Sequence, residues 1–148
     1  EIDSVSRANE KTNINVGITI NWARSVIEKR NVLGAVEHIS EVARSGMLSG
    51  IMFSGVTDIK DHKYGQWEDT HMPPARAFDV EYYEEGSLMT VENIEASLMA
   101  CDMKALDYIG IKLQAMPKDA LIERRVGINR DAMKILDIVT SRVHDANV

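Results

Sequence analysis

The chain has 148 residues, of which 45% are hydrophobic and 27% charged, a balance typical of one soluble globular domain. Its net charge of −6, with no cluster of Lys and Arg, argues against a nucleic-acid partner, because phosphate binding needs gathered positive charge. Cys101 is the only cysteine and no apolar run approaches the roughly 20 residues that span a bilayer, so we expect a cytoplasmic protein without disulfides or membrane partners.

The first predicted strand covers residues 13–20, where polar or small residues alternate with β-branched ones, and it ends at Asn21-Trp22. The polar residues 4–12 before it could be the tail of a preceding helix. From Val32 onward a helix is predicted, because apolar residues recur at helical spacing until Gly46, a natural helix stop. Its expected buried stripe comprises Val32, Val36, Ile39 and Ala43.

A second strand is predicted at residues 48–53, a short apolar run of the type that parallel sheets bury on both faces. Residues 55–89 then show no clear period and contain several Gly and Pro residues. A connection of this length is rarely idle in a compact domain. It is therefore interpreted either as a functional lid over the active-site face or as a disordered segment.

A helix is predicted after Thr90, whose hydroxyl can accept a hydrogen bond from a free N–H of the first turn. Its expected buried face comprises Val91, Ile94, Leu98 and Met99. The third strand is predicted at residues 106–113. A last helix, capped by Asn129, is predicted to bury the stripe Ala132, Ile135, Leu136, Val139 and Val143.

The elements alternate as strand, helix, strand, long loop, helix, strand and helix. Alternation with helix-length crossovers indicates the α/β class with a parallel sheet and right-handed crossovers. The sequence therefore predicts one α/β domain over residues 1–148.

A resemblance to xylose-isomerase-like barrels, which are sugar isomerases and epimerases, rests on residues 67–74 (WEDTHMPP) and 85–88 (EGSL). This stretch resembles the loop after the seventh barrel strand. Residues 21–28, 53–55 and 107–112 resemble more closely an uncharacterised bacterial family assigned to that superfamily. The resemblance implies a partial (β/α)8 TIM barrel, with this chain supplying strands six to eight and their helices.

A complete barrel of this kind usually needs about 250 residues, so we expect the chain to be the C-terminal part of one. It begins at Glu1, which suits a fragment, a processed chain or a proteolysis product. The exposed edges of such a partial barrel would pair with another copy or with the missing half-barrel, because unpaired strand edges attract partners.

The same resemblance implies a divalent metal, held by acidic residues and His at several strand ends, that polarises the sugar. Here the strand ends are Asn21, Ser54 and Lys112, which are poor ligands for a hard cation. We therefore assign no metal ligand in this chain and leave its cofactor unknown. Ligands from other strands could still restore a metal site.

Active sites of such barrels lie at the C-terminal ends of the strands. This rule selects seven candidates: Asn21, Trp22, Arg24, Ser54, Asp69, His71 and Lys112. His71 suits proton transfer near neutral pH, and Asp69 could orient it or share a substrate hydroxyl. Lys112 could bind a phosphate or carboxylate, or form a Schiff base with a carbonyl. Asn21 and Ser54 are assigned to substrate binding.

Arg24 could hold an anion in a forked geometry, and Trp22 and Trp67 could line a sugar pocket. Each candidate also has a structural interpretation. His71 could simply pack beside Pro73, the two Trp rings could belong to the core, and Lys112 could pair with Asp69 or Glu68. Glu28, Glu68 and Glu85 could serve as acid or base, but solvated charges are expected for them. Surface positions are expected for His38, His62 and His144.

The leading hypothesis is a carbohydrate isomerase or epimerase that acts on a sugar or sugar phosphate, with catalysis by His71, Asp69 and Lys112. One alternative is a non-catalytic ligand-binding or truncated barrel. A second alternative is a Schiff-base lyase or aldolase that uses Lys112. The DNA-repair endonucleases of the same superfamily are disfavoured, because they need several metal ligands and a basic face.

Overall fold

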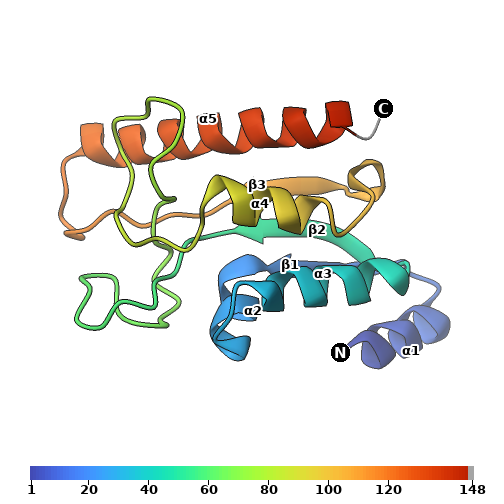
Figure 1. Ribbon diagram of the computed structural model, residues 1–148. Coiled ribbons are helices and arrows are strands. Elements are labelled where there is room, and N and C mark those ends of the chain that lie inside the picture. Colours follow the sequence, from blue (N-terminus) through green and yellow to red (C-terminus); the bar gives the residue numbers. More distant parts are fainter. Residues whose placement is uncertain (147–148) are drawn as a thin grey trace.

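The computed structural model describes residues 1–146 and builds them around a small sheet with helices (Figure 1). In chain order the elements are α1 (Ile2–Thr12), β1 (Ile18–Asn21), α2 (Trp22–Lys29), α3 (Leu33–Arg44), β2 (Leu48–Phe53), α4 (Val91–Leu98), the 3-10 helix η1 (Met103–Ala105), β3 (Tyr108–Ile111) and α5 (Ile122–Ala146). The α/β class is confirmed, and helix α1 occupies the polar segment before the first strand.

The three strands form one parallel sheet in the order β1-β2-β3, which confirms the predicted parallel pairing. In the register, Asn21 of β1 lies opposite Met52 of β2, and Met52 lies opposite Gly110 of β3. Consecutive strands are therefore spatial neighbours, and every strand runs in the same direction. All three strand ends consequently point to one edge of the sheet.

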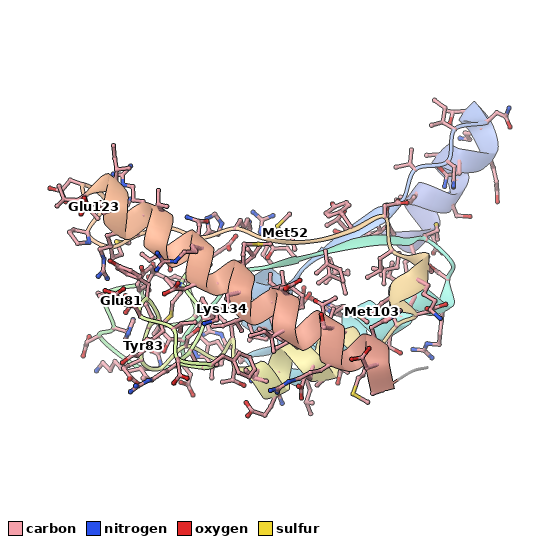
Figure 2. All side chains as sticks on the ribbon, turned by 90° about the horizontal axis from the view of Figure 1, so that it is seen from above. Met52, Glu81, Tyr83, Met103, Glu123 and Lys134 are labelled. Atoms are coloured by element: carbon pink, nitrogen blue, oxygen red, sulfur yellow. The ribbon has the colours of Figure 1, made fainter. Side chains whose placement is uncertain are left out.

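The helices that connect the strands pack on one face of this sheet. Ile51 and Phe53 of β2 point into that side and are fully buried in the core with Ile39 of α3 and Ile94 of α4. Seen from above, α4 and α5 lie together on one side of the strands (Figure 2). The opposite face carries Tyr108, which is 43% exposed and hydrogen bonds to Thr19 across the middle strand.

The first strand begins later than predicted. Helix α1 ends at Thr12, because the next residue, Asn13, adopts a left-handed conformation (φ 55°) that terminates it. The Asn9 side chain then bonds both backbone groups of Val16: its Oδ1 accepts from the N–H at 2.8 Å and its Nδ2 donates to the carbonyl at 3.0 Å. Because these groups are engaged locally, the extended ladder starts only at Ile18.

Two helices also differ from the prediction. Helix α2 was not predicted, and α3 buries Ala35, Ile39 and Val42, about one position away from the expected stripe, because α2 packs against its side. Helix α5 begins at Ile122, seven residues before the expected cap. Asn129 lies inside the helix and donates from its side chain to the Arg125 carbonyl at 2.8 Å.

The other helix features follow the sequence. The hydroxyl of Thr90 accepts a hydrogen bond from the Asn93 N–H at 3.3 Å, so the predicted cap of α4 is confirmed. Ile94 and Leu98 are fully buried, whereas Met99, expected on the same face, is 67% exposed because it lies just past the end of the helix. The stripe predicted for α5 is buried along its whole length.

The long connection between β2 and α4 is ordered and packed. It contains only isolated bridges, Gly55 with Met72 and Thr57 with Gln66, but it buries apolar side chains in the interior, among them Val56, Tyr64, Met72, Val80 and Met89. The interpretation as a disordered segment is therefore wrong. The connection folds as a compact layer beyond the end of the sheet (Figure 1).

Helix α5 holds part of this connection through Asp131, which is 5% exposed. Its carboxylate accepts hydrogen bonds from the backbone N–H groups of Glu81 and Tyr82 at 2.9 and 2.8 Å, and from Arg130 Nε at 2.9 Å. Burial alone raises the pKa of Asp131, but these hydrogen bonds outweigh it and hold the pKa below its usual value. The carboxylate therefore stays charged and anchors the loop.

Candidate functional site

The residues that follow the three strands lie at one edge of the sheet. Asn21 ends β1, Ser54 follows β2 and Lys112 follows β3. The Lys112 N–H donates to the Phe53 carbonyl at 2.9 Å, so the pairing of β2 and β3 continues to this edge. The loop that carries His71 meets the sheet here.

Backbone hydrogen bonds fix His71 between the ends of β2 and β3. The Gln114 N–H donates to the His71 carbonyl at 2.8 Å. Next to it, Met72 and Gly55 exchange two hydrogen bonds of 2.7 and 3.2 Å. His71 also adopts a left-handed conformation with φ 56°, which costs a non-glycine residue on the order of 1 kcal/mol. Such strain persists only where the surroundings impose it.

Three side chains form a chain of polar contacts around Asp69. Arg24 Nε lies 2.8 Å from Asp69 Oδ2, and His71 Nε2 lies 3.5 Å from Asp69 Oδ1. The second distance is too long for a good hydrogen bond, and Asp69 Oδ1 is buried without a hydrogen-bond partner. Asp69 therefore pairs with Arg24, so the interpretation in which it neutralises Lys112 is wrong. We call Arg24, Asp69, His71 and Lys112 the rim cluster.

The surroundings of His71 favour its neutral form. Burial lowers the pKa of His71 below its usual value, and the positive charges of Lys112 and Arg24 lower it further, against the opposing effect of Asp69. The imidazole is therefore uncharged near neutral pH. Its Nδ1 has no hydrogen-bond partner among residues 1–146, so the ring is available to accept a proton.

Asn21 and Ser54 differ in how their side chains are used. Asn21 caps α2, because its Oδ1 accepts the Arg24 N–H at 3.5 Å. Ser54 is fully buried, and its Oγ has no hydrogen-bond partner in the described chain. The Asn21 side chain therefore already has a structural hydrogen bond, whereas the Ser54 hydroxyl has none within the described residues.

The tryptophans do not form the predicted sugar platform together. Trp22 is fully buried, its ring lies 6.4 Å from that of Phe53, and its indole N–H donates to Ser97 Oγ at 2.9 Å. The assignment of Trp22 to substrate binding is therefore wrong, because its whole surface is used in the core. Trp67 is half-buried and its ring lies 5.5 Å from the Arg30 guanidinium at the end of α2.

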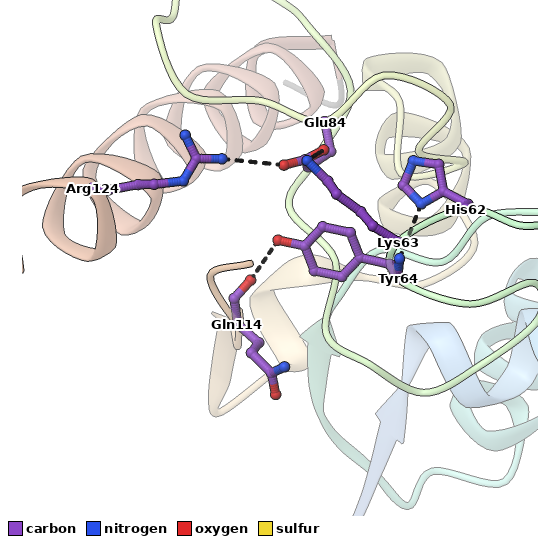
Figure 3. A network of polar contacts seen from close by, with 6 residues as sticks. All are labelled: His62, Lys63, Tyr64, Glu84, Gln114 and Arg124. Carbon is purple, nitrogen blue, oxygen red and sulfur yellow. Dashed lines mark hydrogen bonds and ion pairs between the residues drawn. The ribbon is translucent and has the colours of Figure 1, made fainter. Parts of the chain in front are cut away.

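A second charged group, which the sequence did not predict, joins the long connection to the start of α5 (Figure 3). The Glu84 carboxylate, only 7% exposed, receives Lys63 Nζ at 2.7 Å and Arg124 Nη2 at 3.5 Å. Beside it the Tyr64 hydroxyl donates to the Gln114 carbonyl at 2.9 Å. Burial and the negative charge of Glu84 raise the pKa of Tyr64 to about 12. We call Lys63, Tyr64, Glu84 and Arg124 the loop clamp.

An open hollow with a volume of about 680 Å³ runs beside the free edge of β1. Asn21 and Arg24 lie at it, together with His38. His38 is half-buried and its Nδ1 lies 3.0 Å from Ser25 Oγ, so it is not the solvated surface residue that was expected. The hollow is open and is lined along one side by a strand edge without a neighbour within residues 1–146.

The side chains at the rim do not fit a divalent cation. The strand ends carry an amide, a hydroxyl and an ammonium group, and the nearby carboxylate of Asp69 is taken by Arg24. Within residues 1–146, no three His, Cys, Asp or Glu side chains gather where they could hold a metal ion.

No helix in the described part of the chain combines the length and the apolar character needed to cross a membrane.

Comparison with known proteins places residues 1–128 on a family model described as "Domain of unknown function (DUF4862)". The chain is also similar to "Uncharacterized protein STM3670" of Salmonella typhimurium (strain LT2), with 34% identity over 127 residues. That match covers 86% of this chain and 38% of the relative. The chain thus spans well under half the length of this curated relative. No solved structure matches the chain.

Proposed function

Because this chain belongs to the DUF4862 family, which has no assigned activity, we propose its function from the rim cluster. The full-length protein is a carbohydrate isomerase or epimerase that binds a sugar or sugar phosphate at the C-terminal edge of the sheet. The observation that carries the proposal is an uncharged His71 held at that edge beside Lys112 and the Arg24–Asp69 pair.

The barrel architecture is part of the proposal. Three parallel strands in sequential order, with their connecting helices on one face, are the arrangement of a barrel wall, whereas doubly wound sheets carry helices on both faces. The uncovered face and the free edges of β1 and β3 would be closed by further strands of the full-length protein. Alone, this chain should associate through those edges, and light scattering that gives a single-chain mass at micromolar concentration would argue against them.

The chemistry suited to this site is removal of a proton from a carbon next to a carbonyl. His71 accepts the proton at a ring nitrogen, the C–H electrons form a C=C bond, and the carbonyl electrons move onto oxygen. In an isomerisation, the proton returns to the former carbonyl carbon while the proton of the adjacent hydroxyl moves to the former carbonyl oxygen, so the carbonyl group changes place. In an epimerisation, a proton returns to the other face of the same carbon and the carbonyl re-forms. No redox partner is required.

The cations of the rim cluster support this step. Negative charge develops on the carbonyl oxygen, and a fixed ammonium or guanidinium group nearby stabilises it. Lys112 has no ion-pair partner among the described residues, so its charge is free to act on a substrate. Asp69 holds Arg24 in position and limits how far the pKa of His71 falls.

Substitution of His71 by Ala tests the proposal. In the full-length protein, turnover of the responsive substrate in a panel of aldoses, ketoses and their phosphates should fall by a factor of roughly 10² to 10⁴, the usual contribution of a general base. His144→Ala is the matched control, since His144 is an exposed residue near the end of α5. Unchanged turnover in the His71 variant would remove His71 from the mechanism.

A ligand-binding protein without catalysis is the rival that the 3.5 Å separation of His71 and Asp69 favours, because the ring is only loosely oriented. Calorimetry with the same panel separates the two. Binding without conversion of any compound supports the rival, whereas conversion rejects it.

A Schiff-base lyase or aldolase is the second rival, favoured by the unpaired Lys112. In that reaction the Lys112 amine attacks the carbonyl carbon and water leaves. Borohydride would reduce the resulting imine to a stable adduct. A mass increase on Lys112 after reduction supports this rival, and its absence with a turned-over carbonyl substrate excludes it.

A further inference from the structure

The ends of β2 and β3 carry two polar groups side by side that the rest of the described chain does not satisfy. Phe53 and Ile111 are register partners and both pack toward the core. The next residues, Ser54 and Lys112, follow at neighbouring positions, because the Lys112 N–H donates to the Phe53 carbonyl at 2.9 Å.

Ser54 provides the first indication that something binds there. Its side chain is 0% exposed and its Oγ lacks any hydrogen-bond partner in residues 1–146. A buried hydroxyl without a partner costs on the order of 1 to 3 kcal/mol, so such groups are rare without a reason. A ligand oxygen is one way to satisfy it.

Lys112 provides the second indication, from charge. Of the two cations in the rim cluster, Arg24 is neutralised by Asp69 at 2.8 Å, whereas Lys112 has no carboxylate partner in the described chain. Lys112 is half-buried, and no carboxylate within residues 1–146 lies at ion-pair distance from its ammonium group. The end of β3 therefore carries an excess positive charge that an anion would neutralise.

We propose that Lys112 and Ser54 form a subsite for an oxyanion, the phosphate or carboxylate of the substrate, beside His71. The inference rests on the proposed function and narrows its substrate class from sugars in general to sugar phosphates or sugar acids. Lys112 supplies the charge and the Ser54 hydroxyl donates a hydrogen bond to one oxygen of the anion.

Binding of an anion at this subsite changes the pKa of His71, the proposed general base. The charged groups that influence His71 are Lys112 at the end of β3, Asp69 in the same loop and Arg24 on α2. An anion bound to Lys112 cancels the positive charge that lowers the pKa of His71, so the pKa rises. A substrate with the anionic group thus makes His71 a stronger base, whereas a neutral sugar does not.

The test measures the pKa of His71 by NMR in the full-length protein, with the ring signal assigned by its loss in His71→Gln. Sulfate serves as the probe for phosphate and acetate as the probe for carboxylate, with ionic strength held constant by chloride. We expect one or both anions to raise the pKa of His71 by about half a unit or more. No shift with either anion would overturn the proposal.

Variants show whether the two residues carry the response. Lys112→Met should raise the pKa of His71 without any anion and weaken anion binding on the order of tenfold to a hundredfold. Ser54→Ala should weaken binding about fivefold and leave the anion-free pKa unchanged. Lys134→Met, the same change at an exposed position of α5, should alter neither quantity. Equal anion affinity in the Lys112 variant and the wild type would overturn the subsite.

Lys112→Arg guards against a folding defect, because it keeps the positive charge and should retain part of the anion response. The outcomes also separate this inference from the proposed function. An anion response without turnover of any sugar leaves the subsite intact and removes the isomerase. Turnover of neutral sugars that does not change in the Lys112 variants removes the subsite and leaves the isomerase intact.

Discussion

The loop clamp and the rim cluster each place one carboxylate among two cations, yet they differ in how the charges meet. In the clamp both cations contact Glu84, at 2.7 and 3.5 Å, and the carboxylate is 7% exposed (Figure 3). In the rim cluster only Arg24 contacts Asp69, which is 25% exposed, and Lys112 stands apart. Both cations of the clamp therefore pair with its carboxylate, although Arg124 Nε is buried without a hydrogen-bond partner, whereas one cation of the rim cluster has no carboxylate partner among residues 1–146.

This difference teaches how to separate a stabilising group of charges from a binding one. Glu84 joins Lys63, from its own loop, to Arg124 at the start of α5, so its contacts hold the long connection against the body of the chain. The rim cluster joins the ends of elements but leaves a cation without a partner. We expect changes in the clamp to alter stability and changes at the rim to alter chemistry.

The largest stability effect should come from Glu84→Gln. The change leaves Lys63 and Arg124 without their counter-charge, and because both cations keep access to water, we expect a loss of about 2 kcal/mol, below that of a fully buried pair. Urea denaturation measures it. Glu85→Gln, at the exposed neighbouring position, is the matched control and should change stability by less than about 0.5 kcal/mol.

At the rim, Asp69→Asn should destabilise by about 1 kcal/mol or less, because Arg24 is 71% exposed and such surface pairs contribute little. If it destabilised the protein more than Glu84→Gln, the two clusters would have exchanged their roles and the comparison would fail.

A second effect on stability is expected at high pH and comes from Tyr64 of the loop clamp. The pKa of Tyr64 is raised from 10.0 to about 12, so the folded protein holds this proton more tightly than the unfolded chain. The stability contribution is complete below pH 10 and is lost as the pH rises toward 12. Denaturation across this window should show a steeper decline for the wild type than for Tyr64→Phe. An equal decline of stability with pH in the two proteins would show that the pKa of Tyr64 is not raised in the folded state.

The smallest effects concern the pKa of His71 and sharpen the description of the rim. Asp69 raises this pKa and Arg24 lowers it, so Asp69→Asn should lower the value and Arg24→Met should raise it. Changes of a few tenths of a unit are expected for such partly exposed groups. NMR titration of His71 measures both, and shifts in the same direction for the two variants would refute the assigned electrostatics.

The parts of the fold that sequence patterns predicted are those with local signals. The apolar run Leu48–Phe53 matches β2 residue for residue, and Thr90 caps α4 as expected. The start of α5 was not predicted, because the apolar residues of its first turns are exposed and form no buried stripe: Ile122 is 78% and Val126 is 59% exposed. The false start of β1 reflects the Asn9 side chain, which mimics a partner for the backbone.

The candidate site also has a part that the sequence predicted and a part that it did not. The strand-end rule selected Asp69, His71 and Lys112, and the structure brings them together with Arg24. The clamp could not be predicted, because Glu84 and Arg124 are 40 residues apart and lie where the sequence has no period. Trp22 was misassigned, since its bond to Ser97 joins two helices that the sequence does not show to be neighbours.

The most direct test of the central claim, that His71 moves a proton at the rim, is deuterium exchange. The full-length protein is incubated in D₂O with aldoses, ketoses and their phosphates, and NMR follows deuterium at the carbon next to the carbonyl. We predict incorporation by the wild type and by His144→Ala, and a rate at least about a hundredfold lower for His71→Ala. Equal incorporation in the His71 variant, or none with any substrate, would contradict the account.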